Sequence, residues 1–72
     1  MDTMKTITRE LVLTEAKEVV MAAHGRNDFY TLAEARARLN AVIHMARRLG
    51  LLTDDVVKDI KREAKKELAE EN

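Results

Sequence analysis

The chain contains no proline, and its two glycines, Gly25 and Gly50, divide its 72 residues into three segments of similar length. Each segment is dominated by Ala, Leu, Glu, Lys and Arg, which are strong helix formers. Each glycine follows an apolar-periodic stretch, where helices commonly end in a left-handed residue that glycine adopts without strain. The sequence therefore predicts three helices joined by two short connections.

The three helices are expected at about residues 8–24, 31–49 and 54–69 of a single domain spanning 1–72. The second helix has the clearest start, because Thr31 and Glu34 have the spacing of a capping box. A strand over residues 6–13 is the alternative, since that stretch is rich in β-branched residues. A lone strand would have no partner strand, so the helix is favoured.

The third helix is expected to begin at Thr53, preceded by Leu52, which has hydrophobic-staple spacing to Val57. The connection over residues 50–53 is short, so we expect the second and third helices to be neighbours, with the first packed across them. The predicted fold class is all-α: a three-helix bundle, or a helical hairpin with an extra N-terminal helix. An intertwined homodimer would bury the same apolar stripes between chains.

Composition excludes several functional classes. The chain has no Ser and no Cys, so the usual catalytic nucleophiles are missing and an enzyme is not expected. His24 and His44 lack metal-ligand spacing, and no glycine-rich loop could hold a phosphate, so we expect no metal and no cofactor. Basic and acidic residues balance at 13 each, which disfavours a dedicated nucleic-acid binder.

Cellular location follows from what the sequence lacks. No apolar run approaches the roughly 20 residues of a membrane span. The first residues have neither the apolar stretch nor the cleavage site of a secretory signal. We therefore expect a cytoplasmic protein. A chain this short without disulfides or a structural metal has a small core, which favours self-association as a homodimer.

The charges of the third helix are segregated about its apolar stripe. One flank carries Lys58, Lys61, Arg62 and Lys65, and the other carries Asp59, Glu63, Glu67 and Glu70. A narrow apolar seam between opposite charges is typical of the edge of a helix–helix interface. The basic flank is therefore predicted to contact a partner helix, either from a second copy or from another protein.

Further partner-binding candidates lie outside the predicted core stripes: Leu11, Met21, Phe29, Tyr30, Ala37, Ala41 and His44. The two alanines belong to a ladder that would let another backbone come close, and the histidine could form a hydrogen bond across an interface. The two aromatic residues are expected to close one end of the bundle. The alternative is that they are anchors for a partner's pocket, because rigid aromatic side chains dominate binding hot spots.

The segment from Ala46 to Val56 resembles the helix-turn-helix pattern, with an alanine, Gly50 four residues on and an apolar residue six further. The resemblance covers less than a third of the chain. It implies a DNA-binding regulator whose third helix contacts DNA through its basic flank. Asp54 and Asp59 depart from the pattern, because they place acidic residues where phosphates approach and where a buried apolar residue is expected.

These features together predict a small helical protein–protein interaction module. We expect an accessory regulator or inhibitor that binds and blocks another protein. In size and composition the chain resembles the small helical proteins with which bacterial viruses and mobile elements disable host factors, including transcription regulators. The alternatives are a small helix-turn-helix-like DNA-binding regulator and a structural subunit of a larger assembly.

Overall fold

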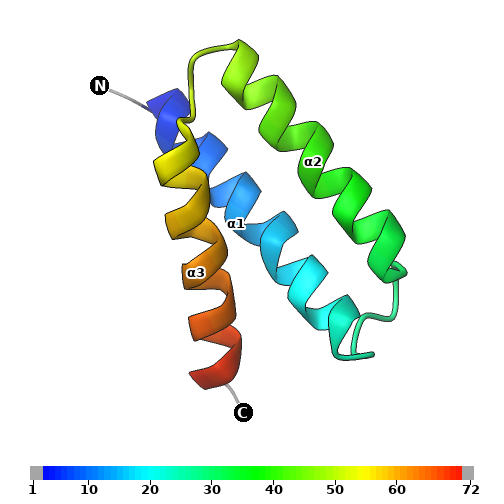
Figure 1. Ribbon diagram of the computed structural model, residues 1–72. Helices are drawn as coiled ribbons and strands as arrows, with labels where there is room; N and C mark the ends of the chain where they lie inside the picture. Colours follow the sequence, from blue (N-terminus) through cyan, green and yellow to red (C-terminus); the bar gives the residue numbers. More distant parts are fainter. Residues whose placement is uncertain (1–2, 71–72) are drawn as a thin grey trace.

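The computed structural model describes residues 3–70, which form a bundle of three helices (Figure 1). The helices are α1 (Thr3–Ala23), α2 (Leu32–Arg48) and α3 (Asp54–Glu70). The described residues contain no strand, so the predicted all-α class is confirmed. None of these helices combines the length and the apolar character needed to cross a membrane.

Both glycines end a helix in the predicted way. Gly25 and Gly50 have φ angles of 69° and 72°, and both take part in the paired hydrogen bonds of a Schellman motif. After α2, Gly50 N–H donates to the Arg47 carbonyl at 3.0 Å and Leu51 N–H donates to the Ala46 carbonyl at 2.8 Å. The carbonyls at the end of α2 are thereby satisfied, and the chain is turned toward α3.

The starts of α2 and α3 also match the sequence patterns. The Glu34 N–H donates to the Thr31 hydroxyl at 3.1 Å, and the Thr31 N–H donates to the Glu34 carboxylate at 2.9 Å. These two bonds complete the capping box. At the start of α3, Leu52 and Val57 are both buried in the core, as the hydrophobic staple predicts.

The first helix begins at Thr3, five residues before the predicted start at Thr8, and the strand alternative is wrong. The Thr8 side chain is buried, and its hydroxyl donates to the Met4 carbonyl at 2.7 Å. A threonine that bonds the carbonyl four residues earlier satisfies its own polar group within a helix. Residues 3–7 are exposed, so the helix extends over them despite the weak helix propensity of its β-branched residues and with little packing against the remainder of the chain.

The packing order differs from the expected one, because α1 and not α2 is the central helix. α2 and α3 both pack along α1, while they contact each other far less (Figure 1). They start close together at their connection and diverge toward the opposite end of the molecule. α1 can serve both neighbours because its apolar arc is wide, with Val12 and Ala16 buried and Leu13, Val19 and Val20 half-buried around them.

The core lies along α1 and is small. Its buried hydrophobic members are Val12, Ala16, Ala35, Leu39, Ile43, Ala46, Leu52, Val57, Ile60 and Ala64. Four of the ten are alanines, which contribute little buried area each. Such a core stabilises a single chain only modestly, so surfaces that remain apolar outside it can add to stability when they are covered.

Candidate protein-binding surfaces

One flank of the α1–α2 pair carries a cluster of exposed apolar side chains, which we call the apolar face. It consists of Met4 and Leu11 from α1 and Ala41, Met45 and Leu49 from α2 and its end. The side chains of Met4, Met45 and Leu49 are each at least 60% exposed. Large exposed apolar clusters of this kind mark interaction sites on small proteins.

The apolar face is a shallow hollow with almost no polar lining. Its volume is about 380 Å³, and Thr8 is the one polar residue among the described residues that line it. Two residues of the Gly50 turn also border the hollow. They are Leu51 and Ala46, which are joined by the hydrogen bond from the Leu51 N–H to the Ala46 carbonyl. The turn that ends α2 therefore also shapes one end of this surface.

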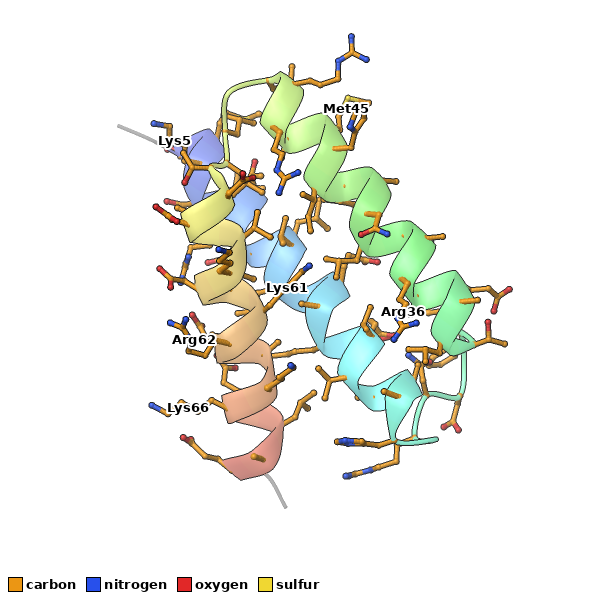
Figure 2. The ribbon with its side chains drawn as sticks, viewed as in Figure 1. Lys5, Arg36, Met45, Lys61, Arg62 and Lys66 are labelled. Atoms are coloured by element: carbon orange, nitrogen blue, oxygen red, sulfur yellow. The ribbon has the colours of Figure 1, made fainter. Side chains whose placement is uncertain are left out.

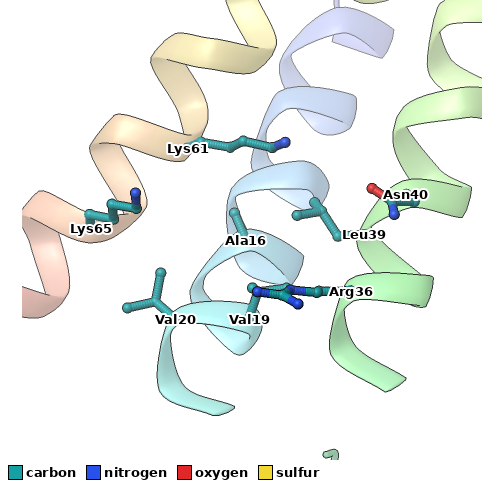
Figure 3. A pocket seen from close by; sticks show the side chains of 8 residues that line it. All are labelled: Ala16, Val19, Val20, Arg36, Leu39, Asn40, Lys61 and Lys65. Carbon is teal, nitrogen blue, oxygen red and sulfur yellow. The ribbon is translucent and has the colours of Figure 1, made fainter. Parts of the chain in front are cut away.

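A second surface lies between α2 and α3, where the two helices diverge over α1. It consists of two adjoining hollows of about 250 and 520 Å³, which share Val19, Val20, Arg36 and Lys65. α1 supplies the floor through small apolar residues, from Ala16 to Ala23 (Figure 3). We call this surface the cationic groove, because no acidic residue is found among the described residues that line it.

The rim of the cationic groove carries positive charge on both walls. Arg36 extends from α2 over the floor, and Lys61 and Lys65 extend from α3 on the opposite side (Figure 3). Within residues 3–70, none of these three side chains forms an ion pair or a side-chain hydrogen bond. Their charges are therefore available to a bound group.

The opposite flank of α3 holds that helix against α1. Arg9 on α1 contacts the Glu63 carboxylate at 2.9 Å, and Lys17 contacts the Glu67 carboxylate at 2.5 Å. The hydrogen bond from Lys17 lowers the pKa of Glu67 below its usual range. Charge segregation on α3 thus separates two roles: Glu63 and Glu67 pair with α1, while Lys61 and Lys65 line the groove.

A buried carboxylate joins α1 to α2. Glu15 is only 7% exposed and accepts a hydrogen bond of 3.1 Å from Nε of Arg38. The guanidinium of Arg38 also lies 4.6 Å from the centre of the Tyr30 ring, within cation–π range. The bond to Glu15 raises the pKa of Arg38 above its ordinary value.

Phe29 does not close the end of the bundle, so that prediction is wrong for this residue. Its side chain is 83% exposed, whereas Tyr30 is half-buried beneath Arg38. The side-chain oxygen of Asn27 accepts hydrogen bonds from the backbone N–H groups of Phe29 and Tyr30, at 2.9 and 3.0 Å. The Asn27 amide also donates to Glu18 on α1, which fixes a turn that directs Phe29 outward.

The other predicted contact residues do not form one surface. Leu11 and Ala41 lie in the apolar face, while Lys61 and Lys65 line the cationic groove. Ala37, His44 and Lys58 are exposed outside both surfaces, and Met21 is half-buried near the end of α1. Arg62 points away from the groove (Figure 2) and pairs with Asp59 at 3.2 Å.

Sequence reasoning missed Met4, Met45, Leu49 and Arg36, and the sequence held a signal for two of them, Met4 and Arg36. Met4 and Ile7 precede Leu11 at helical spacing, but they fell before the predicted start of the first helix. Arg36 and Asn40 share one flank of α2, because they are four residues apart. The sequence does not show that Arg36 faces a second basic wall, because that depends on α3 lying on the opposite side of the groove.

The described residues contain no cluster of three or more His, Asp or Glu side chains able to hold a metal ion. Asp54 pairs with Arg47 across the Gly50 connection at 2.6 Å, so two charges within the segment that resembles a helix-turn-helix neutralise each other. Comparison of the chain with protein-family models, curated proteins and solved structures finds no match.

Proposed function

We propose that this chain is a small protein–protein interaction module that forms a homodimer through its apolar face. As a dimer it acts as an accessory regulator or inhibitor that binds and blocks another protein. The observation that supports the proposal is the continuous apolar face formed by Met4, Leu11, Met45 and Leu49, on a chain whose surface is otherwise rich in charge.

A second copy of the chain fits the apolar face better than a charged partner does. None of the described residues that line the hollow is charged, so within residues 3–70 this surface offers a partner shape and apolar area but no charge to recognise. Two such faces related by a twofold axis cover each other, as in most homodimers. Ala41 lies within the face and would allow two α2 helices to approach closely.

The small core supplies a second argument for a dimer. Chains of this length bury a low fraction of their surface, and many gain stability by association. Covering Met4, Leu11, Met45 and Leu49 would add large apolar side chains to a core whose largest fully buried side chains, within residues 3–70, are Ile60 and Val12.

The test is the solution mass of the purified chain, measured by light scattering across a range of concentrations. We expect about twice the 8.2 kDa of one chain. The double variant Leu11→Glu with Met45→Glu should be a folded monomer, because both side chains are exposed in the single chain. Placing charges on a face that is buried in the dimer should prevent association.

A control places two glutamates away from the apolar face, on α3. Lys58→Glu with Lys66→Glu alters exposed positions that do not line the hollow, so this variant should remain a dimer. A monomeric unmodified chain, or a Leu11→Glu/Met45→Glu variant that dimerises as well as the control, would refute the proposed interface.

A further inference from the structure

We infer that the cationic groove binds an amphipathic helix of another protein whose apolar stripe is flanked by acidic residues. This inference rests on the proposed function only in taking the chain to be a protein-binding module. It concerns a surface separate from the apolar face. Arg36 and Asn40, which line the groove, lie on the opposite flank of α2 from Met45 and Leu49, so a dimer through the apolar face leaves the groove accessible.

The floor of the groove suits a short helix. It follows α1 from Ala16 to Ala23, which corresponds to about 12 Å at 1.5 Å per residue. Two to three turns of a partner helix extend over that length, and they present apolar side chains at i, i+3, i+4 and i+7. The floor residues Val19, Val20 and Ala23 are small enough to leave room for leucine-sized side chains between the walls.

The positive charge of the rim determines which residues the flanks of the partner helix should carry. Arg36 on one wall faces Lys61 and Lys65 on the other, and no carboxylate lines either hollow among the described residues. A helix lying along the floor places its two flanks against these two walls. Acidic residues on both flanks would meet unpaired cations, whereas basic residues would be repelled.

The way in which α3 is held supports this assignment. Glu63 and Glu67 are engaged by Arg9 and Lys17, so these two carboxylates are not available to neutralise the lysines of α3. α2 and α3 also contact each other little, so the apolar floor lies between walls that no fourth element covers within residues 3–70. Charge complementarity therefore favours an acidic amphipathic helix over a neutral one.

The test uses designed, fluorescently labelled peptides as probes, with binding followed by fluorescence anisotropy. The first peptide, of about 15 residues, carries leucines at i, i+3, i+4 and i+7 and glutamates on both flanks. The second replaces each glutamate with lysine, and the third keeps the glutamates but replaces the leucines with serines. We expect only the first to bind, with affinity that decreases as salt rises because exposed charges are screened.

Two charge-reversed variants locate the site. Lys61→Glu with Lys65→Glu should weaken binding of the first peptide by at least about tenfold, because attraction becomes repulsion, and should favour the lysine peptide. The control, Lys58→Glu with Lys66→Glu, makes the same charge change at exposed positions of α3 outside the groove. The control should bind the first peptide nearly as well as the unmodified chain does.

The floor is tested by Val20→Thr, which keeps the shape of the side chain but replaces one methyl group with a hydroxyl. This variant should bind the acidic peptide several-fold more weakly, while its circular dichroism shows that the helices are retained. Equal binding of the leucine and serine peptides would overturn the inference, since charge alone would then account for the affinity. Binding of mixed-sequence duplex DNA, but not of the acidic peptide, would also overturn it.

The monomeric variant Leu11→Glu with Met45→Glu separates this inference from the proposed dimer. Because the groove is formed within one chain, the variant should bind the acidic peptide as tightly as the unmodified chain does. If the chain dimerises but the peptide does not bind, the groove assignment fails and the dimer stands. If the peptide binds but the chain is monomeric, the groove assignment stands and the dimer fails.

Discussion

The carboxylate of Glu15 on α1 is held by the guanidinium of Arg38 on α2, with 3.1 Å between the accepting oxygen and the donating Nε. The side chain of Glu15 is 9% exposed, whereas that of Arg38 is 49% exposed. Glu15 therefore depends on its partner more than Arg38 does, because water reaches the carboxylate far less than the guanidinium. Loss of the arginine leaves a desolvated charge on α1, but loss of the carboxylate releases a guanidinium that water can solvate.

This inequality predicts the ranking of three variants in urea unfolding. Arg38→Ala should lower the free energy of unfolding more than Glu15→Gln does, because a buried carboxylate without a partner is strongly unfavourable. Adding Glu15→Gln to Arg38→Ala should restore part of the lost stability. Additive losses in the double variant would contradict the coupling between the two residues.

The ion pair of Lys17 with Glu67 predicts how stability depends on acidity. The hydrogen bond from Lys17, and secondarily one with Glu63, lowers the pKa of Glu67 from its usual 4.5. A carboxylate whose pKa is lowered in the folded state stabilises the fold above its unfolded pKa. That contribution is lost as the pH falls from about 4.5 through the lower folded value.

Glu67→Gln removes this titrating group and isolates its effect. The variant should be less stable than the unmodified chain near neutral pH, and the difference should shrink as the pH falls below about 4. Urea midpoints measured at a series of pH values provide the comparison. A difference in stability that stays constant over the pH series would show that the substitution does not act through the loss of the negative charge.

Gly50 provides a test of backbone conformation without a packing effect. Its φ angle is 72°, and a Cβ built at this position would meet no atom within 4 Å. Gly50→Ala should therefore lower the free energy of unfolding by about 1–2 kcal/mol, which is the cost of the left-handed conformation for an L-residue. Chemical synthesis with D-alanine at this position should restore most of that loss, whereas equal losses for the two enantiomers would count against a conformational origin.

Substitution of Phe29 tests whether this aromatic side chain is exposed or packs against the end of the bundle. Because its side chain is 83% exposed, Phe29→Ser should change the free energy of unfolding by no more than about 0.5 kcal/mol. Ile60→Ala, at a fully buried position, should lower it by about 2–5 kcal/mol. A loss for Phe29→Ser near that of Ile60→Ala would mean that the ring packs against the chain in solution.

The sequence was sufficient to predict the elements that depend on local signals. The ends of α1 and α2 follow from Gly25 and Gly50, and the start of α2 follows from Thr31 and Glu34. These motifs act over three to five residues, so their spacing can be read directly from the chain. The early start of α1 was missed because residues 3–7 include β-branched residues of weak helix propensity and are exposed, so they add no apolar positions to the core stripe of the helix.

The neighbour relationships could not be predicted in the same way. Periodicity gives the angular position of Glu15 or Arg36 on its own helix, but it does not say which helix lies opposite. Glu15 shares a stripe with Val12 and Val19, which could have marked it as a buried carboxylate in need of a cation. That its cation is Arg38, and that Lys61 faces a groove, both follow from the central position of α1.

The central position of α1 also determines when the fold can be completed during synthesis. α1 emerges first, yet its contacts with α3 join residues as far apart as Arg9 and Glu63, which are separated by 54 positions. Domains generally fold as units, from the N-terminus onward, as the chain is made. Until α3 has been made, this chain can offer at most an α1–α2 hairpin, with the α3-binding side of α1 uncovered. A ribosome that stopped before Asp54 would release a product that lacks one wall of the groove and the acidic partners of Arg9 and Lys17.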